Sequence, residues 1–243
     1  MRDCDWALVV PLKPLRAAKS RLAGAVGDAD RRALALAFAE DTVAAALRCP
    51  AVRDVVVVTS DPEATRALTA LGAGVVPDRP DAGLNAALAH GAATLPGRAV
   101  AAMNADLPAL RPAELGRVLA LAAERPRAFL PDAAGVGTTL LAARAGVPLA
   151  PAFGGPSRAR HRDSGAVELS PPGVASVRRD VDTVADLAVA RTLGVGPRTA
   201  ALLRELPYLS RALTPRPAER RPTAGRPDGR PAPAARTSGA SGR

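Results

Sequence analysis

Cysteine, lysine, histidine and aromatic residues are all scarce in this chain of 243 residues. Its two cysteines, Cys4 and Cys49, exclude a disulfide framework and a cysteine-rich zinc module. No apolar run reaches the roughly 18 residues that a membrane span needs, and Asp3 and Asp5 stand where a signal peptide would be basic and then apolar. Aromatic residues make up only 2%, so alanine and aliphatic side chains must fill the core. We therefore expect a cytoplasmic protein that contacts no membrane.

Positive charge is in excess, with 33 basic residues against 23 acidic ones and a net charge of +10. Residues 211–243 carry +6 of this charge, because they hold eight arginines and two acidic residues. The same segment has six prolines, four glycines and no apolar period, so we predict a disordered tail over 211–243 behind one domain over 1–210. Charge in a tail and a shortage of aromatic stacking residues argue against nucleic-acid binding, which stays a distant alternative.

Strand-like and helix-like segments alternate along the first two hundred residues. Short apolar runs typical of buried strands cover residues 6–10, 55–58, 74–77, 99–103, 128–130 and 138–141. Helical patterns cover residues 28–47, 84–93, 112–123 and 183–193, and a further helix begins at Pro62 behind an Asp61 cap. This alternation predicts an α/β domain whose central, mostly parallel sheet has helices on both faces.

Several common catalytic motifs are missing. Neither lysine follows a glycine, which excludes a Walker A loop, and no dinucleotide-binding glycine fingerprint or Gly-x-Ser-x-Gly elbow is present. The two histidines, His90 and His161, are interpreted as exposed helix residues. Ser157 and Asp163 lie near His161 in the sequence, but no pattern holds the three as a catalytic triad. The sequence therefore gives little support for general base catalysis by histidine.

The first loop, residues 11–22, concentrates positive charge directly after the first predicted strand. It contains Lys13, Arg16, Lys19 and Arg21. The two lysines are the only lysines of the chain, in which arginine is otherwise used in place of lysine. Ligands of open α/β sheets bind outside the carboxyl ends of the strands, and lysine acts as a compact point charge. The first loop therefore predicts a phosphate-binding site.

Three aspartates are candidate metal ligands. Asp106 follows the predicted strand 99–103, and Asp180 and Asp182 alternate by two, so in an extended segment they point the same way. Carboxylates suit Mg²⁺ that also binds phosphate. A structural alternative stays open for two of them: Asp106 could be merely the cap of a turn, and Asp182 merely the cap of a helix.

Glycine-containing segments supply candidate anion sites. Residues 132–140 and 153–161 each combine glycines, which allow close backbone approach, with hydroxyl groups such as those of Thr139 and Ser157. The helix that starts at Gly83 could hold a nucleobase or a ribose near its first amides. Each of these segments, taken singly, could also be an ordinary turn.

Taken together, these segments resemble the phospholactate and phosphoenolpyruvate guanylyltransferases that serve the synthesis of the deazaflavin coenzyme F-420. The matching segments, in chain order, are 10–22, 83–88, 106–110, 135–140 and 179–183. The resemblance extends over about residues 6–205 and stops before the tail. One departure is that the family usually reads Phe-Gly-Pro-Gly-Ser where this chain has Phe153-Gly154-Gly155-Pro156-Ser157.

The resemblance implies a Rossmann-like, GT-A-like nucleotidyltransferase fold and the transfer of GMP from GTP to the phosphate of phosphoenolpyruvate. It also implies the roles of individual residues: Lys13, Lys19 and Asp106 as catalytic residues; Asp106, Asp180 and Asp182 as ligands of Mg²⁺; Lys13, Lys19, Arg21, Gly83 and Asn85 as nucleotide-binding residues; and Thr139, Gly154 and Ser157 as phosphoenolpyruvate-binding residues. The expected partners are the two small-molecule substrates and no nucleic acid or membrane, and a homodimer is left open.

Alternatives remain within this reaction class. The acceptor could be 2-phospho-L-lactate or 3-phosphoglycerate, although the Arg- and Ala-rich composition resembles actinobacterial proteins, for which phosphoenolpyruvate is expected. Another nucleotidyltransferase, acting on molybdopterin or a sugar phosphate, is the nearby runner-up. Those families usually carry a glycine-rich first loop, which residues 11–22 lack.

Overall fold

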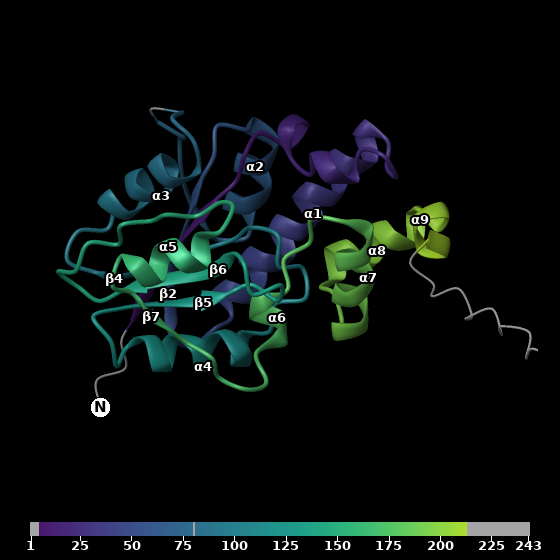
Figure 1. Ribbon diagram of the computed structural model, residues 1–243. Helices are drawn as coiled ribbons and strands as arrows, with labels where there is room; N and C mark the ends of the chain where they lie inside the picture. The colour runs from purple at the N-terminus through teal and green to yellow at the C-terminus, as the bar shows by residue number, and fades with distance from the viewer. Residues whose placement is uncertain (1–4, 80, 213–243) are drawn as a thin grey trace, which may run out of the picture.

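The computed structural model describes residues 5–79 and 81–212 (Figure 1). Its centre is a seven-stranded sheet with the strand order β3-β2-β1-β4-β6-β5-β7. The strands are β1 (Trp6–Pro11), β2 (Val52–Val58), β3 (Gly74–Val76), β4 (Ala99–Met103), β5 (Arg127–Pro131), β6 (Thr138–Ala143) and β7 (Val167–Glu168). Only β6 runs antiparallel to its neighbours β4 and β5. The predicted α/β fold with a mostly parallel sheet is thus confirmed.

The helices lie on both faces of this sheet, and the C-terminal ones lie together to one side of it (Figure 1). They are α1 (Asp28–Leu47), α2 (Pro62–Ala70), α3 (Leu84–Ala93), α4 (Pro112–Ala122), α5 (Ser157–Asp163), α6 (Ala175–Arg178), α7 (Val184–Leu193), α8 (Pro197–Glu205) and α9 (Pro207–Ala212). No described helix is both long and apolar enough to pass through a lipid bilayer. The predicted tail, 211–243, overlaps α9 by two residues and otherwise lies outside the described residues.

Two hydrophobic clusters cover the two faces of the sheet. On one face, α1, α2, α4 and α6 pack on β1, β2 and β4, largely through alanine, valine and leucine. On the other face, α3 packs together with Phe129 and Phe153. Helix α3 lies close to the strands because Gly91 has no side chain: a Cβ there would come within 2.6 Å of both Val9 and Val58. The aliphatic core expected from the composition is what the structure contains.

A third cluster joins α7, α8 and α9 to the outer face of α1. Asp41 of α1 anchors this group, because its carboxylate accepts hydrogen bonds from the backbone N–H groups of Arg198 (3.1 Å) and Thr199 (2.8 Å) at the start of α8. The sequence patterns predicted α7 and placed His161 on a helix without giving the bounds of α5, but missed α6, α8, α9 and β7. These elements have at most nine residues, too few to display a clear apolar period.

Candidate active site

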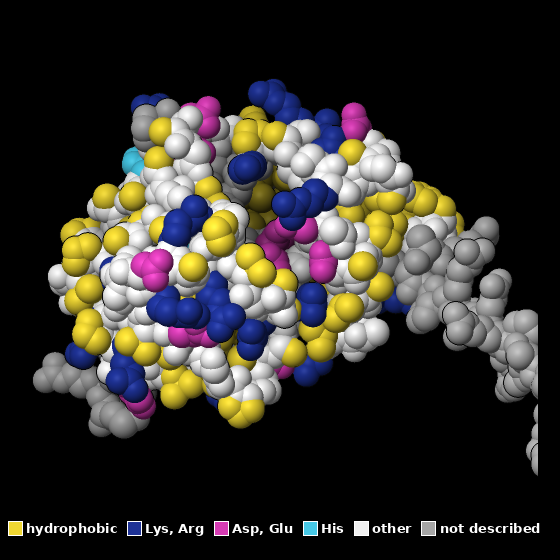
Figure 2. Space-filling view, viewed as in Figure 1, with side chains coloured by type: hydrophobic (Ala, Val, Ile, Leu, Met, Phe, Trp, Pro, Cys, Tyr) yellow, Lys and Arg dark blue, Asp and Glu magenta, His cyan; other side chains and the backbone are white. Residues whose placement is uncertain are grey.

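A pocket of about 650 Å³ opens where β1 and β4 end at their carboxyl termini. Ligand pockets of proteins typically have volumes of this order. Figure 2 shows a hollow on this face in which basic and acidic side chains border one another. The charged and polar side chains of its lining are those of Lys13, Lys19, Ser20, Arg21, Asn104, Asp106, Asp132, Thr138, Ser157, Asp180 and Asp182. The structure therefore brings the predicted phosphate-binding loop and the three predicted aspartates into one site.

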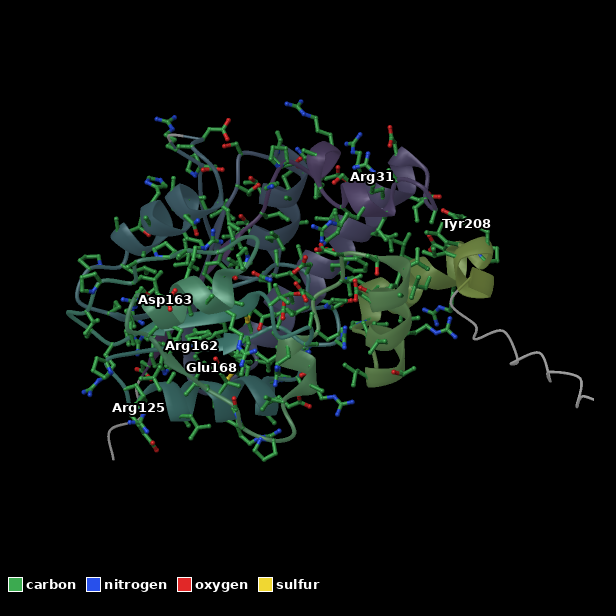
Figure 3. The ribbon with its side chains drawn as sticks, in the orientation of Figure 1. Arg31, Arg125, Arg162, Asp163, Glu168 and Tyr208 are labelled. Carbon is green, nitrogen blue, oxygen red and sulfur yellow. The ribbon has the colours of Figure 1, made fainter. Side chains whose placement is uncertain are left out.

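The first loop takes its shape from contacts made by α1 and α2. Arg31 of α1 is buried, and its guanidinium donates to the carbonyl oxygens of Ala18 (2.6 Å) and Arg16 (3.3 Å). Asp61, the cap of α2, accepts a hydrogen bond from the Leu15 N–H at 2.9 Å. Figure 3 shows Arg31 near the start of α1, next to this loop. The sequence patterns gave no role to Arg31 and only a capping role to Asp61.

Lys19 lies at the centre of the charged part of the pocket. Its ammonium group donates to the carboxylate of Asp106 and, at 3.1 Å, to that of Asp182, and the Lys19 side chain is only 9% exposed. Burial alone would lower the pKa of Lys19, but the two carboxylates outweigh it and raise the pKa above its ordinary value. Arg21 donates to the other oxygen of Asp182 at 2.9 Å. Lys13 is exposed on the same pocket and pairs with no carboxylate of the described residues.

Asp106 is held by the backbone on both sides of it. The N–H of Leu107, the next residue, donates to the hydroxyl of Thr42 in α1 at 3.0 Å. The carbonyl oxygen of Asp106 accepts from the N–H of Val181 at 3.0 Å, which ties the end of β4 to the segment that carries the other two aspartates. Its carboxylate faces the pocket, so Asp106 is more than a turn cap.

Asp180 and Asp182 flank a buried residue. Val181 packs fully buried in the cluster beneath α7, and both neighbouring aspartates line the pocket, as their alternation predicted. Asp182 does not cap α7: Thr183 caps it, and Asp186 completes the capping box. The Asp182 carboxylate is therefore not used as a helix cap and lies in the pocket.

These carboxylates suit a divalent cation. Within residues 5–79 and 81–212, no group of three His, Cys, Asp or Glu side chains is gathered around one point as ligands would be. However, Oδ1 of Asp106 is buried and has no hydrogen-bond partner. Burial raises the pKa of Asp180 to about 7, and the carboxylates of Asp106, Asp182 and Asp132 add to the effect. A bound cation would favour the ionised form of these crowded carboxylates, and hard oxygen donors suit Mg²⁺.

The loop after β5, residues 132–137, forms the opposite wall of the pocket. The carboxylate of Asp132 accepts from the N–H groups of Val136 (3.0 Å) and Gly137 (2.8 Å), which closes the loop. A Cβ at Gly137 would lie 2.4 Å from that carboxylate, so the turn requires glycine. Arg158 of α5 donates to the carbonyl oxygen of Gly135 at 3.0 Å and binds both oxygens of Glu168. Asp132 is a pocket residue that the sequence patterns did not single out.

The loop before α5, residues 152–156, is held from α3 and α5. Asn85 donates to the carbonyl oxygen of Phe153 at 3.2 Å and accepts from its N–H at 2.7 Å, so both ends of its amide are engaged. Arg160 donates to the carbonyl oxygens of Ala152, Phe153 and Gly154. Of the segment predicted to hold the nucleoside, Leu84 lines the pocket, whereas Gly83 and Asn85 do not.

The order Gly154-Gly155-Pro156 has a conformational reason. Gly154 and Gly155 have φ angles of +90° and +47°, and Pro156 follows at −77°. Proline holds φ near −65° and could not occupy the second of these positions. The departure from the usual Phe-Gly-Pro-Gly-Ser order therefore matches the path of this loop, and Gly154 and Ser157 still line the pocket.

Strand β6 enters the site through an irregularity. Leu130 pairs with Leu140 and Pro131 with Thr138, which leaves Thr139 as an extra residue. Thr138 lines the pocket, and Thr139 is fully buried beside it with a hydroxyl group that has no partner among the described residues.

The interpretation of His161 as an exposed residue is wrong. It lies on a helix, α5, but its side chain is fully buried, because it bonds Thr138 and the Ala152 N–H and packs between two phenylalanine rings. His90 is half-buried on α3. The spacing of four residues between Ser157 and His161 was the available signal, because it places both on the same inward face of α5.

Comparisons with known proteins agree with this geometry. A model of the MobA-like NTP transferase domain matches residues 36–168. Phosphoenolpyruvate guanylyltransferases of Streptomyces coelicolor and Thermomonospora curvata are 66% and 62% identical to the chain; the alignments cover 83% and 86% of this chain and 97% and 92% of theirs. A nucleotide-diphospho-sugar transferase structure from Desulfovibrio desulfuricans shares the fold, with a TM-score of 0.65 at 21% identity, over 86% of this chain and 98% of that one.

Proposed function

The chain belongs to the phosphoenolpyruvate guanylyltransferase family and is a nucleotidyltransferase, and on this basis we propose that it transfers GMP from GTP to phosphoenolpyruvate. A phosphate oxygen of phosphoenolpyruvate attacks the α-phosphorus of GTP. The bond between the α- and β-phosphates breaks, and pyrophosphate leaves with its electron pair. The product is enolpyruvoyl-2-diphospho-5'-guanosine, an intermediate of coenzyme F-420 synthesis in this proposal.

One observation carries the proposal: both lysines of the chain and the three predicted aspartates line a single pocket at the ends of β1 and β4. Lys13 and Arg21 present exposed cations at this pocket, and Lys19 adds a buried one. We assign these three side chains to the triphosphate, whose charge in the leaving pyrophosphate they would offset.

Mg²⁺ is the proposed cofactor, with Asp106, Asp180 and Asp182 as its ligands. When bound, it would act as a Lewis acid that offsets the negative charge developing on the reacting phosphates. The residues of the chain themselves position this set: Thr42 and Val181 hold the backbone around Asp106, and buried Val181 directs Asp180 and Asp182 to the same pocket.

The proposed chemistry needs no general base. The phosphate of the acceptor is already ionised near neutral pH, so catalysis rests on alignment and on electrostatic stabilisation. The described histidines fit this view, because His161 is engaged within the protein and His90 does not line the pocket.

The acceptor is assigned to the wall formed by β6 and the start of α5. Gly154 and Ser157 line the pocket there, and Thr139 lies fully buried beside Thr138 with a hydroxyl group that has no partner among the described residues. Gly83 and Asn85 are proposed to support nucleotide binding indirectly. Asn85 holds Phe153 by hydrogen bonds, and Leu84, the residue between Gly83 and Asn85, faces the pocket.

Release of pyrophosphate from GTP and Mg²⁺ tests the proposal. Phosphoenolpyruvate, 2-phospho-L-lactate and 3-phosphoglycerate are compared as acceptors, and ATP and CTP replace GTP in matched reactions. We expect the largest kcat/KM for GTP with phosphoenolpyruvate. Release with a different acceptor would correct the substrate, and no release with any of the three would refute the proposed reaction.

A further inference from the structure

His161 is fixed in a buried position next to the pocket. Its Nε2 accepts a hydrogen bond from the Ala152 N–H at 3.0 Å, and its Nδ1 lies 2.9 Å from the hydroxyl oxygen of Thr138. The ring packs between those of Phe129 and Phe153, with centroids 5.7 and 5.1 Å away. The side chain is completely inaccessible to solvent, so its orientation follows from protein contacts alone.

These contacts determine which nitrogen carries the hydrogen. A backbone N–H can only donate, so the contact with Ala152 requires a lone pair on Nε2. In neutral imidazole the hydrogen must then be on Nδ1, which donates it to Thr138. Burial, assisted by the positive charges of Arg127 and Arg160, lowers the pKa of His161 to about 4, which agrees with a neutral ring at pH 7.

The hydroxyl hydrogen of Thr138 is consequently left free. Its oxygen accepts from His161, and no described residue accepts a hydrogen bond from Thr138 in return. Thr138 is buried but contributes to the pocket lining, together with Gly137 and Ser157. A buried donor without an acceptor is unfavourable unless a ligand or water supplies one.

We propose that His161 orients the Thr138 hydroxyl as a hydrogen-bond donor to an anionic oxygen of the phosphorylated acceptor. Thr138 is then a binding residue, and His161 is a positioning residue that acts only through it. This inference rests on the proposed function in one respect, since it takes the acceptor to lie against β6 and α5.

Substitutions at Thr138 test the donor. Thr138→Val keeps the shape and removes the hydroxyl group, whereas Thr138→Ser keeps the hydroxyl group. For Thr138→Val we expect the KM for phosphoenolpyruvate to rise about tenfold, with the KM for GTP unchanged, and for Thr138→Ser a KM close to that of the wild type. Equal KM values for phosphoenolpyruvate in Thr138→Val and the wild type would overturn the proposal.

A double-mutant cycle tests whether His161 acts through Thr138. The amide of His161→Gln takes the place of Nε2, where its oxygen can accept from the Ala152 N–H, and leaves no N–H at the place of Nδ1, which is bonded to Cγ. This variant should therefore raise the KM for phosphoenolpyruvate by itself. Combined with Thr138→Val, it should add no further increase. Additive increases would show that His161 only supports the fold. Thermal unfolding of each variant identifies any change caused by loss of structure.

The tautomer can be read without any substrate. A long-range ¹H–¹⁵N spectrum at pH 7 should show His161 neutral with its hydrogen on Nδ1, and His90→Gln assigns the signal because the chain has only two histidines. A hydrogen on Nε2, or a charged ring, would overturn the inference. If the wild type instead shows this tautomer but does not use phosphoenolpyruvate, the proposed function fails while the free Thr138 donor stands.

Discussion

The two walls of the pocket are built on different principles. The first loop, residues 11–22, presents long charged side chains: Arg31 and Asp61 hold its backbone, and carboxylates across the pocket pair with Lys19 and Arg21. The acceptor wall, consisting of residues 132–138 and 152–157, presents glycines and buried hydroxyl groups, and hydrogen bonds fix it at many points. If the substrates bind as proposed, the cations of the first loop would meet the charge of the triphosphate, and the fixed donors of the acceptor wall would orient the small acceptor.

The largest expected effect lies where the two walls meet. Asp106→Asn removes a charge that contacts Lys19 and would bind the metal, so turnover should fall about a thousandfold. The fold should persist, because the backbone contacts of Asp106 with Val181 and of its neighbour with Thr42 are unaffected. Pyrophosphate release measures the turnover and thermal unfolding measures the stability of the fold. Asp163→Asn, at an exposed aspartate, is the matched control. Unchanged turnover would mean that the Asp106 carboxylate takes no part in the reaction.

Lys19→Ala should separate the two walls. We expect kcat/KM for GTP to fall roughly 10- to 100-fold, since a charge-assisted contact is lost, and the KM for phosphoenolpyruvate to change little. Lys19 has a φ of +56°, so Lys19→Asn, which tolerates this conformation, should give the same result without backbone strain. An effect confined to the acceptor would contradict the assignment of Lys19 to the triphosphate.

The acceptor wall should be sensitive to acid because it depends on a neutral histidine. His161 titrates at about 4 when folded and near 6.5 when unfolded, so between these pH values the unfolded chain binds more protons. His161 should therefore contribute a drop of about 2 kcal/mol in the free energy of unfolding between about pH 7.5 and pH 5. Asp180, whose pKa is raised to about 7, acts in the opposite direction over the same range, because there the folded chain holds the additional proton. Urea unfolding at both pH values should therefore show that acidification destabilises the wild type and His90→Gln by about 2 kcal/mol more than it destabilises His161→Gln.

Removing the support of the first loop should act on the nucleotide alone. Arg31→Ala deletes the donor to the Arg16 and Ala18 carbonyl oxygens, so the KM for GTP should rise about tenfold while the KM for the acceptor stays constant. Arg32→Ala is a matched control, because Arg32 is exposed and makes only a surface ion pair with Glu63. Equal KM values for GTP in both variants would show that the loop keeps its shape without Arg31.

The mirror experiment on the acceptor wall should have the smallest effect. Gly137→Ala forces the new Cβ against the Asp132 carboxylate, so the loop must shift, and the KM for phosphoenolpyruvate should rise several-fold. The KM for GTP should not change. Gly24→Ala has open space around its new Cβ and serves as the control. A rise in both KM values would indicate that the walls are coupled.

Much of the fold could be predicted from local patterns. The apolar runs of β1, β2 and β4 and the long period of α1 are signals within single segments, so their positions agreed with the structure to within a few residues. The short helix α5 is polar, with the sequence Ser-Arg-Ala-Arg-His-Arg-Asp, and has no apolar period of its own. It forms because Arg158 and His161 find partners in Gly135 and Thr138, more than 20 positions earlier in the chain, and Arg160 holds the loop just before the helix.

The sequence by itself determined the α/β class and singled out the charged first loop and the three aspartates as candidates for one site, because residue type and order along a strand carry that information. Only the tertiary structure decided which residues meet across the pocket: Lys19 against Asp106, Arg31 beneath the first loop, and His161 against Thr138. Each of these contacts joins residues at least 13 positions apart in the chain. Chain folding sets such distances, and no pattern within one segment can express them.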